Sequence, residues 1–234
     1  MHALRNRVSA FIAHIFLLAS LSVQAADYYF IVEDGSGRPL ANTSISAPAE
    51  AHSISAETTS PQVSDRPAIM DQINKTFAPG TLAISSGQRV RFPNSDNIRH
   101  HVYSFSPAKP FELKLYSGTP EAPILFDTPG VVVLGCNIHD SMIGYIYIAN
   151  SHVYTLTNTQ GIASFKDITV IDTIHVWHPS LSPDAQTILE LKLSELPQQT
   201  LNNETYFVIR ITPNTAPIAP KKTFKNRLLN HENK

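Results

Sequence analysis

The chain is dominated by short runs in which every second residue is apolar, each bounded by glycine, proline, asparagine or serine. Side chains alternate between the two faces of a strand, so such runs are typical of β-strands with one buried face. Little amphipathic helical periodicity follows the first 25 residues, and the 17 prolines disfavour helix interiors. The sequence therefore predicts an all-β protein.

The predicted strands form three blocks along the chain, 27–47, 68–149 and 153–212. They comprise residues 28–32, 43–47, 81–84, 89–92, 101–105, 131–134, 143–148, 154–156, 163–165, 173–177 and 206–211. The first block is too short to fold alone, so we expect it to pair with the third block in one small sandwich. The predicted domains are thus a discontinuous module of residues 27–60 plus 150–212 and a central domain of residues 66–149, with 48–66 as a linker or exposed loop.

The N-terminus has the pattern of a secretory signal peptide. A basic start with Arg5 and Arg7 is followed by an apolar run from Phe11 to Leu21 and by the small-residue sequence before Ala26. The apolar run is shorter than the roughly 20 residues that span a bilayer. We expect residues 1–25 to be removed and the mature chain to be periplasmic or secreted without a membrane span; a retained anchor is the alternative.

Charge argues against nucleic-acid binding. Loss of Arg5 and Arg7 leaves 16 of the 18 basic residues against 19 acidic ones, a net charge near −3, which is not the footprint of a nucleic-acid-binding protein. A basic cluster follows at the C-terminus, with Lys221, Lys222, Lys225 and Arg227. Residues 213–234 are expected to form a basic, flexible tail, and a docking patch for an acidic partner is the alternative.

Cys136 is the only cysteine, and its neighbours point to a metal. In an oxidising compartment a lone cysteine is buried, paired between chains or bound to a ligand. His139 and Met142 follow it within seven residues, so one short loop offers a thiol, an imidazole and a thioether. Two histidines and one cysteine in a trigonal set, with a long axial methionine, hold copper in blue-copper sites. His100 is the candidate for the second histidine.

Each of these residues also has a plainer interpretation. A lone cysteine is often a small buried hydrophobe, His139 would suit a loop and Met142 a core. Their joint spacing after a β-branched strand favours a metal site. A c-type haem needs a second cysteine, and thioether is a poor zinc ligand. His152, His175 and His178 leave open a second metal site, and structural roles for these histidines are favoured.

The Cys-x2-His-x2-Met spacing after Pro129-Gly130 resembles the copper loop of amicyanin, a short-loop cupredoxin. Upstream, Asn94 closes a Phe-containing strand and His100 follows six positions later, as in the same family. The resemblance covers residues 68–149, and it extends to plastocyanin-like proteins often labelled methylamine-utilisation proteins. It implies a cupredoxin-like Greek-key β-sandwich with one type 1 copper ion. The implied ligands are equatorial His100, Cys136 and His139 and axial Met142.

One position departs from the amicyanin pattern. Amicyanin carries asparagine directly after its first ligand histidine, where this chain has His101. Strand alternation allows only one of His100 and His101 to face the site, and the spacing from Asn94 favours His100.

The flanking blocks carry a looser resemblance. Residues 30–45 and 153–165 are similar to carboxypeptidase regulatory-like modules, which implies an additional small transthyretin-like or Ig-like β-sandwich. Trp177 is expected to anchor the core of the third block.

The implied function is one-electron transfer by a copper protein, with electrons leaving through His139 to a transient redox-partner protein. Val102, Ile138 and Ile143 are candidates for the apolar surround that excludes water. Two alternatives remain: a copper carrier, chaperone or sensor, and a structural or interaction protein with a vestigial site. An enzyme is not expected, since four protein ligands leave no open position for a substrate.

Overall fold

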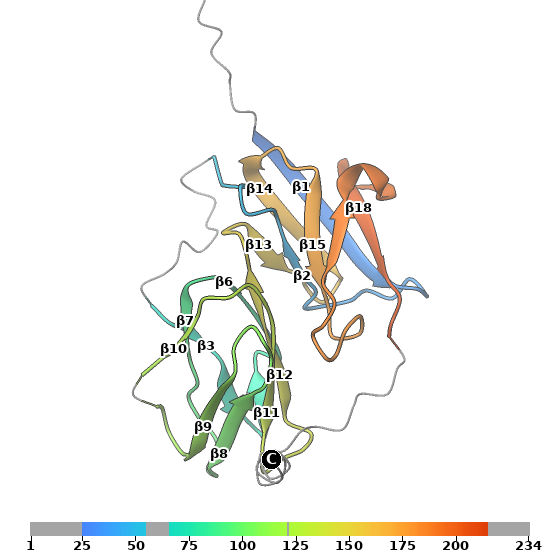
Figure 1. The fold of residues 1–234 in the computed structure, drawn as a ribbon. Coiled ribbons are helices and arrows are strands. Elements are labelled where there is room, and N and C mark those ends of the chain that lie inside the picture. The colour runs from blue at the N-terminus through green and yellow to red at the C-terminus, as the bar shows by residue number, and fades with distance from the viewer. Residues whose placement is uncertain (1–24, 55–65, 121, 215–234) are drawn as a thin grey trace, which may run out of the picture.

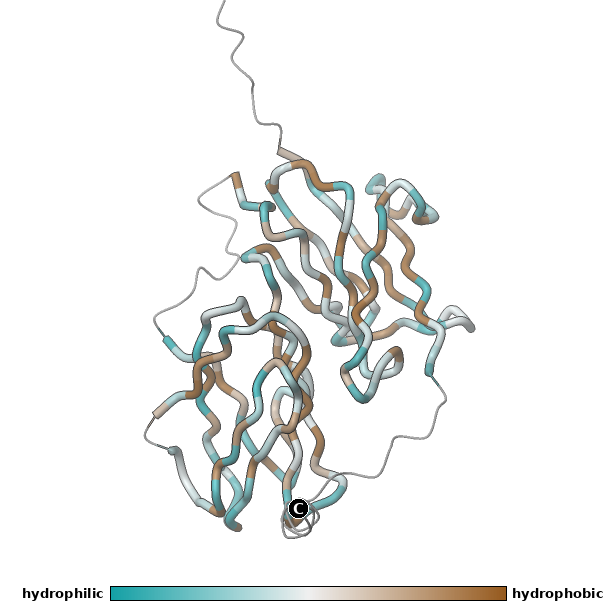
Figure 2. Tube along the Cα trace, in the orientation of Figure 1, coloured by the Kyte–Doolittle hydropathy of each residue, from teal (hydrophilic) through white to brown (hydrophobic). Residues whose placement is uncertain are grey.

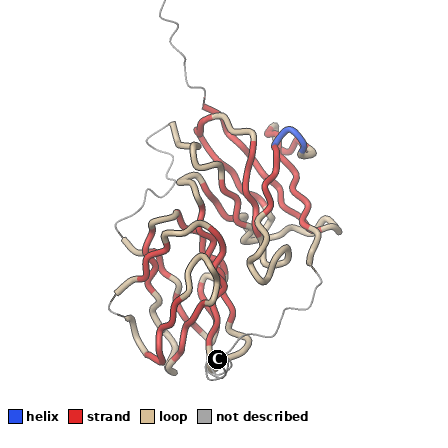
Figure 3. Tube along the Cα trace, viewed as in Figure 1, coloured by secondary structure: helices blue, strands red, loops and turns tan. Residues whose placement is uncertain are grey.

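The computed structural model describes residues 25–54, 66–120 and 122–214. Within them the chain is all-β apart from one short turn of 3-10 helix, η1 (Leu193–Glu195), as Figure 3 shows, and the predicted fold class is confirmed. No described helix is long and apolar enough to cross a membrane. The predicted signal peptide up to residue 24, positions 55–65 of the predicted linker and residues 215–234 of the predicted tail lie outside the described residues.

The strands of residues 25–53 and 153–211 form two four-stranded sheets, which we call the flanking sandwich (Figure 1). One sheet has the order β14 (Ile162–Thr169), β1 (Ala25–Asp34), β18 (Glu204–Ile211) and β17 (Gln198–Leu201). The other has the order β13 (Tyr154–Leu156), β2 (Ser44–Ser46), β15 (Thr173–Trp177) and β16 (Leu189–Lys192). Residues of both sheets enter one shared core, which includes Phe30, Val32, Ile45, Ile174 and Ile209.

The strands of residues 68–149 form the central sandwich. Its largest sheet has the order β6 (Thr81–Ser85), β12 (Ile143–Ala149), β11 (Gly130–Cys136), β8 (His100–Ser104) and β9 (Phe111–Tyr116). The opposing sheet has the order β10 (Ile124–Phe126), β7 (Gln88–Arg91) and β3 (Ala68–Ile69). A separate hairpin consists of β4 (Asp71–Ile73) and β5 (Thr76–Ala78). Their core includes Phe92, Val102, Phe126, Val132 and Leu134.

Apolar residues are concentrated along the strands of both sandwiches, and hydrophilic residues at many of their connections (Figure 2). In the central sandwich, Phe92 packs its ring 5.4 Å from that of Phe111 and 6.3 Å from that of Phe126. Aromatic pairs at these separations are stabilising beyond the area they bury. These ring contacts therefore add to the stability of the central core.

Trp177 lies between the two sandwiches. It is fully buried, and it shares a small core with Val131, Tyr147 and Ala149 of the central sandwich rather than the main core of its own sandwich. Its ring lies 5.1 Å from that of Tyr145 on β12. The prediction that Trp177 anchors the third block is wrong in this respect, because the outer faces of β11 and β12 are apolar and need a cover.

The predicted boundaries of the two domains, and the transthyretin-like or Ig-like character of the flanking sandwich, stay predictions. The strand pairings do establish how the first and last described strands are arranged. Strand β1 pairs with β14 antiparallel and with β18 parallel, so residues from both ends of the described chain meet in one sheet.

Candidate metal centre

Two neighbouring strands of the central sandwich bring His100 and Cys136 together. His100 is the first residue of β8 and Cys136 the last residue of β11. The strands run antiparallel, with Cys136 opposite Val102, so the start of one lies beside the end of the other. Both side chains are buried. The site therefore begins with two residues fixed by backbone pairing rather than by flexible loops.

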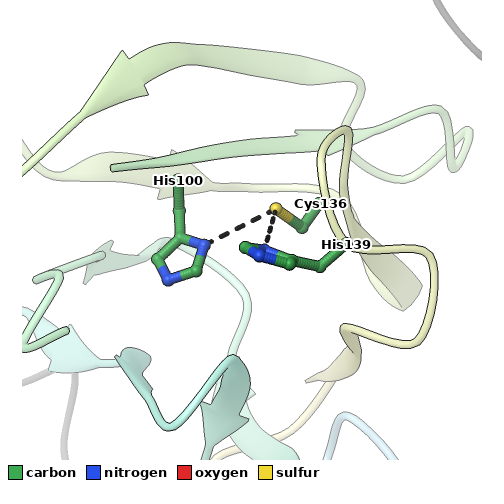
Figure 4. Close-up of side chains that lie close together, drawn as sticks. All are labelled: His100, Cys136 and His139. Carbon is green, nitrogen blue, oxygen red and sulfur yellow. Dashed lines mark hydrogen bonds between the residues drawn. The ribbon is translucent and has the colours of Figure 1, made fainter. Parts of the chain in front are cut away.

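His139 completes a group of three. The sulfur of Cys136 lies 3.7 Å from Nδ1 of His100 and 3.7 Å from Nδ1 of His139 (Figure 4). The ligand atoms of the three residues all lie within 4.8 Å of one another, and the two imidazole rings are 5.0 Å apart. Among the described residues this is the one group of three or more such side chains that could hold a metal ion.

These separations fit a metal. Zinc–ligand bonds of about 2.3 Å to sulfur and about 2.0 Å to nitrogen set the scale for a first-row ion, and a trigonal angle then places sulfur and nitrogen about 3.7 Å apart. Both sulfur–nitrogen distances have this value. A thiolate and two imidazoles are ligands that copper accepts. The donor set and its spacing therefore suit a single ion between the three atoms.

His101 faces the opposite side of β8. Its Nε2 lies 2.9 Å from a carboxylate oxygen of Glu112 on β9, and its ring packs edge-on against Tyr103 at 6.2 Å. Alternation along the strand sends neighbouring side chains to opposite faces. The structure therefore brings His100, and not His101, to the group with Cys136 and His139.

Asn94 organises the segment that leads to His100. Its side-chain amide donates to the carbonyls of Ile98 and Tyr116, both at 2.9 Å, and its Oδ1 accepts from the backbone N–H of Asp96 at 3.0 Å. The backbone N–H of Asn94 also donates to the carbonyl of Gly118. One buried amide thus ties the loop to the end of β9, which gives a physical reason for an asparagine six positions before the histidine.

Asp96 contacts the far side of the His100 ring. Its Oδ2 lies 2.7 Å from Nε2 of His100, whose Nδ1 points to Cys136. The same carboxylate accepts from the backbone N–H groups of Asn74 at 2.6 Å and Lys75 at 2.9 Å. The pKa of Asp96 is lowered below its ordinary value, mainly by the hydrogen bond from the Lys75 N–H and further by the His100 ring and the Asn74 N–H.

The loop that carries His139 is held by its backbone. The N–H of Asn137 donates to the carbonyl of His101 at 3.2 Å, and the N–H of Met142 donates to the carbonyl of His139 at 3.0 Å. Met142 is fully buried in the same core cluster as Cys136.

Gly135 allows a close approach beside Cys136. A Cβ at this position would lie 2.7 Å from Cζ of Tyr103, whose ring covers the glycine. Burial, with the nearby Cys136 and Asp140, raises the pKa of Tyr103. Only glycine leaves room for this aromatic cover directly before the cysteine.

The expected apolar surround is present in part. Val102 is fully buried, and Ile143 is partly buried. Ile138 is 50% exposed, so the prediction that it helps to exclude water from the site is wrong. The side chain of His139 points inward to Cys136, and the adjacent Ile138 side chain faces solvent. His139 itself is partly buried.

The other histidines have separate partners. His175 lies 3.7 Å from Glu190, and His178 accepts at Nδ1 from the backbone N–H of Ser180 at 3.0 Å. Nδ1 of His152 lies 3.4 Å from the hydroxyl of Ser85. None of the three belongs to a group of three ligand residues within the described chain.

Sequence reasoning missed Asp96. Its position four residues before His100 is visible in the sequence, but its role depends on a contact with the turn at Asn74 and Lys75, and no local pattern signals that contact. The contact of Tyr103 with Gly135 is likewise invisible in the sequence, because it depends on the pairing register of β8 and β11.

No protein-family model matches this chain, and no curated protein matches it. Three solved structures that match part of it are cupredoxin-type proteins. A reduced amicyanin variant is 18% identical and has a TM-score of 0.32, over 42% of this chain and 98% of that one. A purple cupredoxin from Nitrosopumilus maritimus is 20% identical with a TM-score of 0.32, over 35% and 99%.

The third is the copper-containing nitrite reductase from Thermus scotoductus SA-01, which is 24% identical with a TM-score of 0.35. That match covers 44% of this chain and 26% of the reductase. Cupredoxins are thus among the solved structures similar to part of this chain, as the sequence resemblance predicted.

Proposed function

We propose that this protein transfers single electrons through one type 1 copper ion bound by His100, Cys136, His139 and Met142. The observation that carries the proposal is the convergence of one thiol and two imidazole nitrogens, with both sulfur–nitrogen distances at 3.7 Å and with His100 and Cys136 held by paired strands. Copper bound in such a set can be oxidised and reduced with little movement of its ligands, because the protein fixes them.

Met142 is proposed as the axial ligand. Its burial in the core cluster of Cys136, and the backbone hydrogen bond that closes the turn after His139, support this role. A weak axial thioether tunes the potential of a blue-copper site. It also distinguishes copper from zinc, for which thioether is a poor ligand.

Electrons would pass through His139, because this residue is less buried than His100 and Cys136. The half-exposed Ile138 beside it offers an apolar contact for a transient redox partner. Small interfaces are typical of such short-lived electron-transfer complexes. The signal-peptide pattern supports a periplasmic or secreted location. We propose no enzymatic turnover, since four protein ligands leave no position for a substrate.

Copper titration of the mature chain tests this proposal. We expect one copper(II) ion per chain, an intense blue absorption band and the spin-resonance signal of a copper–thiolate site, with a reversible one-electron couple by voltammetry. Zinc(II) titrated under the same conditions should give no colour and should compete for the site. A colourless protein that binds no copper would overturn the proposal. Copper binding without a reversible couple would favour a carrier, chaperone or sensor instead.

A further inference from the structure

The geometry points to Asp96 as a positioning residue that fixes the tautomer of His100 and strengthens this imidazole as a metal donor. This inference rests on the proposed function, because it assigns a partner to a residue proposed to bind copper. It goes beyond the ligand set in naming a residue that the spacing of the ligands does not indicate.

The argument begins with the two nitrogens of one ring. Nδ1 of His100 faces the sulfur of Cys136 at 3.7 Å, and Nε2 faces Oδ2 of Asp96 at 2.7 Å. A carboxylate accepts and does not donate, so the proton of the neutral ring belongs on Nε2. Nδ1 is then free of its proton and its lone pair points to the metal position.

The carboxylate is itself held in place. Two backbone N–H groups, of Asn74 at 2.6 Å and Lys75 at 2.9 Å, donate to its two oxygens. Both of these residues have left-handed backbone angles, with φ of 53° and 58°, which turn consecutive N–H groups toward one acceptor. The His100 side chain is fully buried and that of Asp96 only 12% exposed, so solvent competes little for this contact.

Such a carboxylate changes a metal ligand in two ways. It fixes the orientation of the ring, and it makes the imidazole a stronger electron donor. A stronger donor favours copper(II) over copper(I), which lowers the reduction potential. Among the described residues no carboxylate pairs with His139 in this way, and His139 is more exposed than His100. Asp96 therefore makes the two histidines of the proposed site unequal donors.

Asp96→Asn in the full mature chain tests the inference, with Asp71→Asn as the matched control. Asp71 anchors the same loop, because its carboxylate accepts from the hydroxyl of Ser95 at 2.8 Å and from the backbone N–H of Gln72 at 2.6 Å. The control therefore removes one negative charge and a loop contact without removing the partner of His100.

We expect Asp96→Asn to raise the reduction potential and to weaken copper affinity about 10- to 100-fold, while Asp71→Asn changes both much less. Equal effects of the two substitutions, or an unchanged potential in Asp96→Asn, would overturn the inference and leave Asp96 as a loop anchor.

A second measurement needs no metal and no variant. Nitrogen NMR of the metal-free wild-type chain, at a pH where the ring is neutral, should show His100 protonated at Nε2 and bare at Nδ1. The opposite tautomer would contradict the inference even if copper binds. If that chain shows the expected tautomer but takes up no copper, the proposed function fails while the hydrogen bond to Asp96 stands.

Discussion

The central and flanking sandwiches are built from the same kind of alternating strands, yet they use the ends of those strands differently. In the central sandwich two adjacent strands place His100 and Cys136 side by side at one end of a sheet. In the described part of the flanking sandwich no three metal-ligating side chains converge. His175 lies within β15, opposite Ser46 and Glu190, rather than at a strand end.

Two turn aspartates make the difference concrete. Asp34, at the end of β1, accepts from the backbone N–H groups of Ser36 and Arg38 and pairs with the Arg38 guanidinium at 2.7 Å. These hydrogen bonds lower the pKa of Asp34, and the largest contribution comes from the hydroxyl of Ser36. Asp96 is also held by two backbone N–H groups, but its further partner is the buried ring of His100. One local device closes a turn in the first case and orients a candidate ligand in the second, so function here depends on what the turn faces.

The largest effect expected is that of Cys136→Ser. The serine oxygen does not replace a thiolate in copper charge transfer, so all blue colour should disappear while the flanking sandwich keeps its fold. Visible absorption measures the site, and far-ultraviolet circular dichroism checks that the β-structure is kept; near-ultraviolet dichroism of Trp177 reports only on the contact between the sandwiches. Ser141→Ala, in the same loop and exposed, is the control and should keep the colour. Blue colour surviving in Cys136→Ser would show that Cys136 does not bind the copper, and the proposed site would no longer distinguish the central sandwich from the flanking one.

The next effect tests whether the sandwiches are independent. Trp177 belongs to the flanking sandwich but is buried against Val131 and Tyr147 of the central one. Trp177→Ala should lower the free energy of unfolding by about 3–5 kcal/mol through the cavity it leaves. Urea unfolding followed by far-ultraviolet circular dichroism gives this value.

The same variant should keep its copper colour under native conditions, because Trp177 is not among the site residues. Trp177→Phe, which retains part of the ring, should cost less. A loss below about 1 kcal/mol would mean that the contact between the sandwiches contributes little, since a buried tryptophan normally costs several times more.

The sequence predicted every described strand in the interior of a sheet, and the strands that it missed are all edge strands. The predicted strand at 173–177 coincides with β15, and the predicted 143–148 lies within β12 (Ile143–Ala149). Seven of the described strands were not predicted: β3, β4, β5, β9, β10, β16 and β17. All seven lie at the edges of their sheets, and β17 is exposed along its whole length. An edge strand packs less on both faces, so its alternation is a weaker signal.

The candidate site shows the same limit. Cys136 and His139 are close in sequence, and alternation separates His100 from His101, so these residues could be found from local patterns. The exposure of Ile138 depends on which way the loop turns, and the burial of Trp177 depends on a second sandwich. Both are consequences of packing between distant segments, which spacing does not encode.

Met142 offers the smallest effect and the sharpest comparison within one sandwich. Met142 and Met70 are both fully buried in the core cluster that contains Cys136. A methionine-to-leucine change nearly conserves volume and should cost each variant less than about 1.5 kcal/mol of stability. Met142→Leu should keep the colour but raise the reduction potential, because a weak axial donor is lost, whereas Met70→Leu should leave the potential unchanged. Voltammetry of the two copper-loaded variants separates these roles: equal potentials would identify Met142 as a core residue and reduce the proposed ligand set to His100, Cys136 and His139.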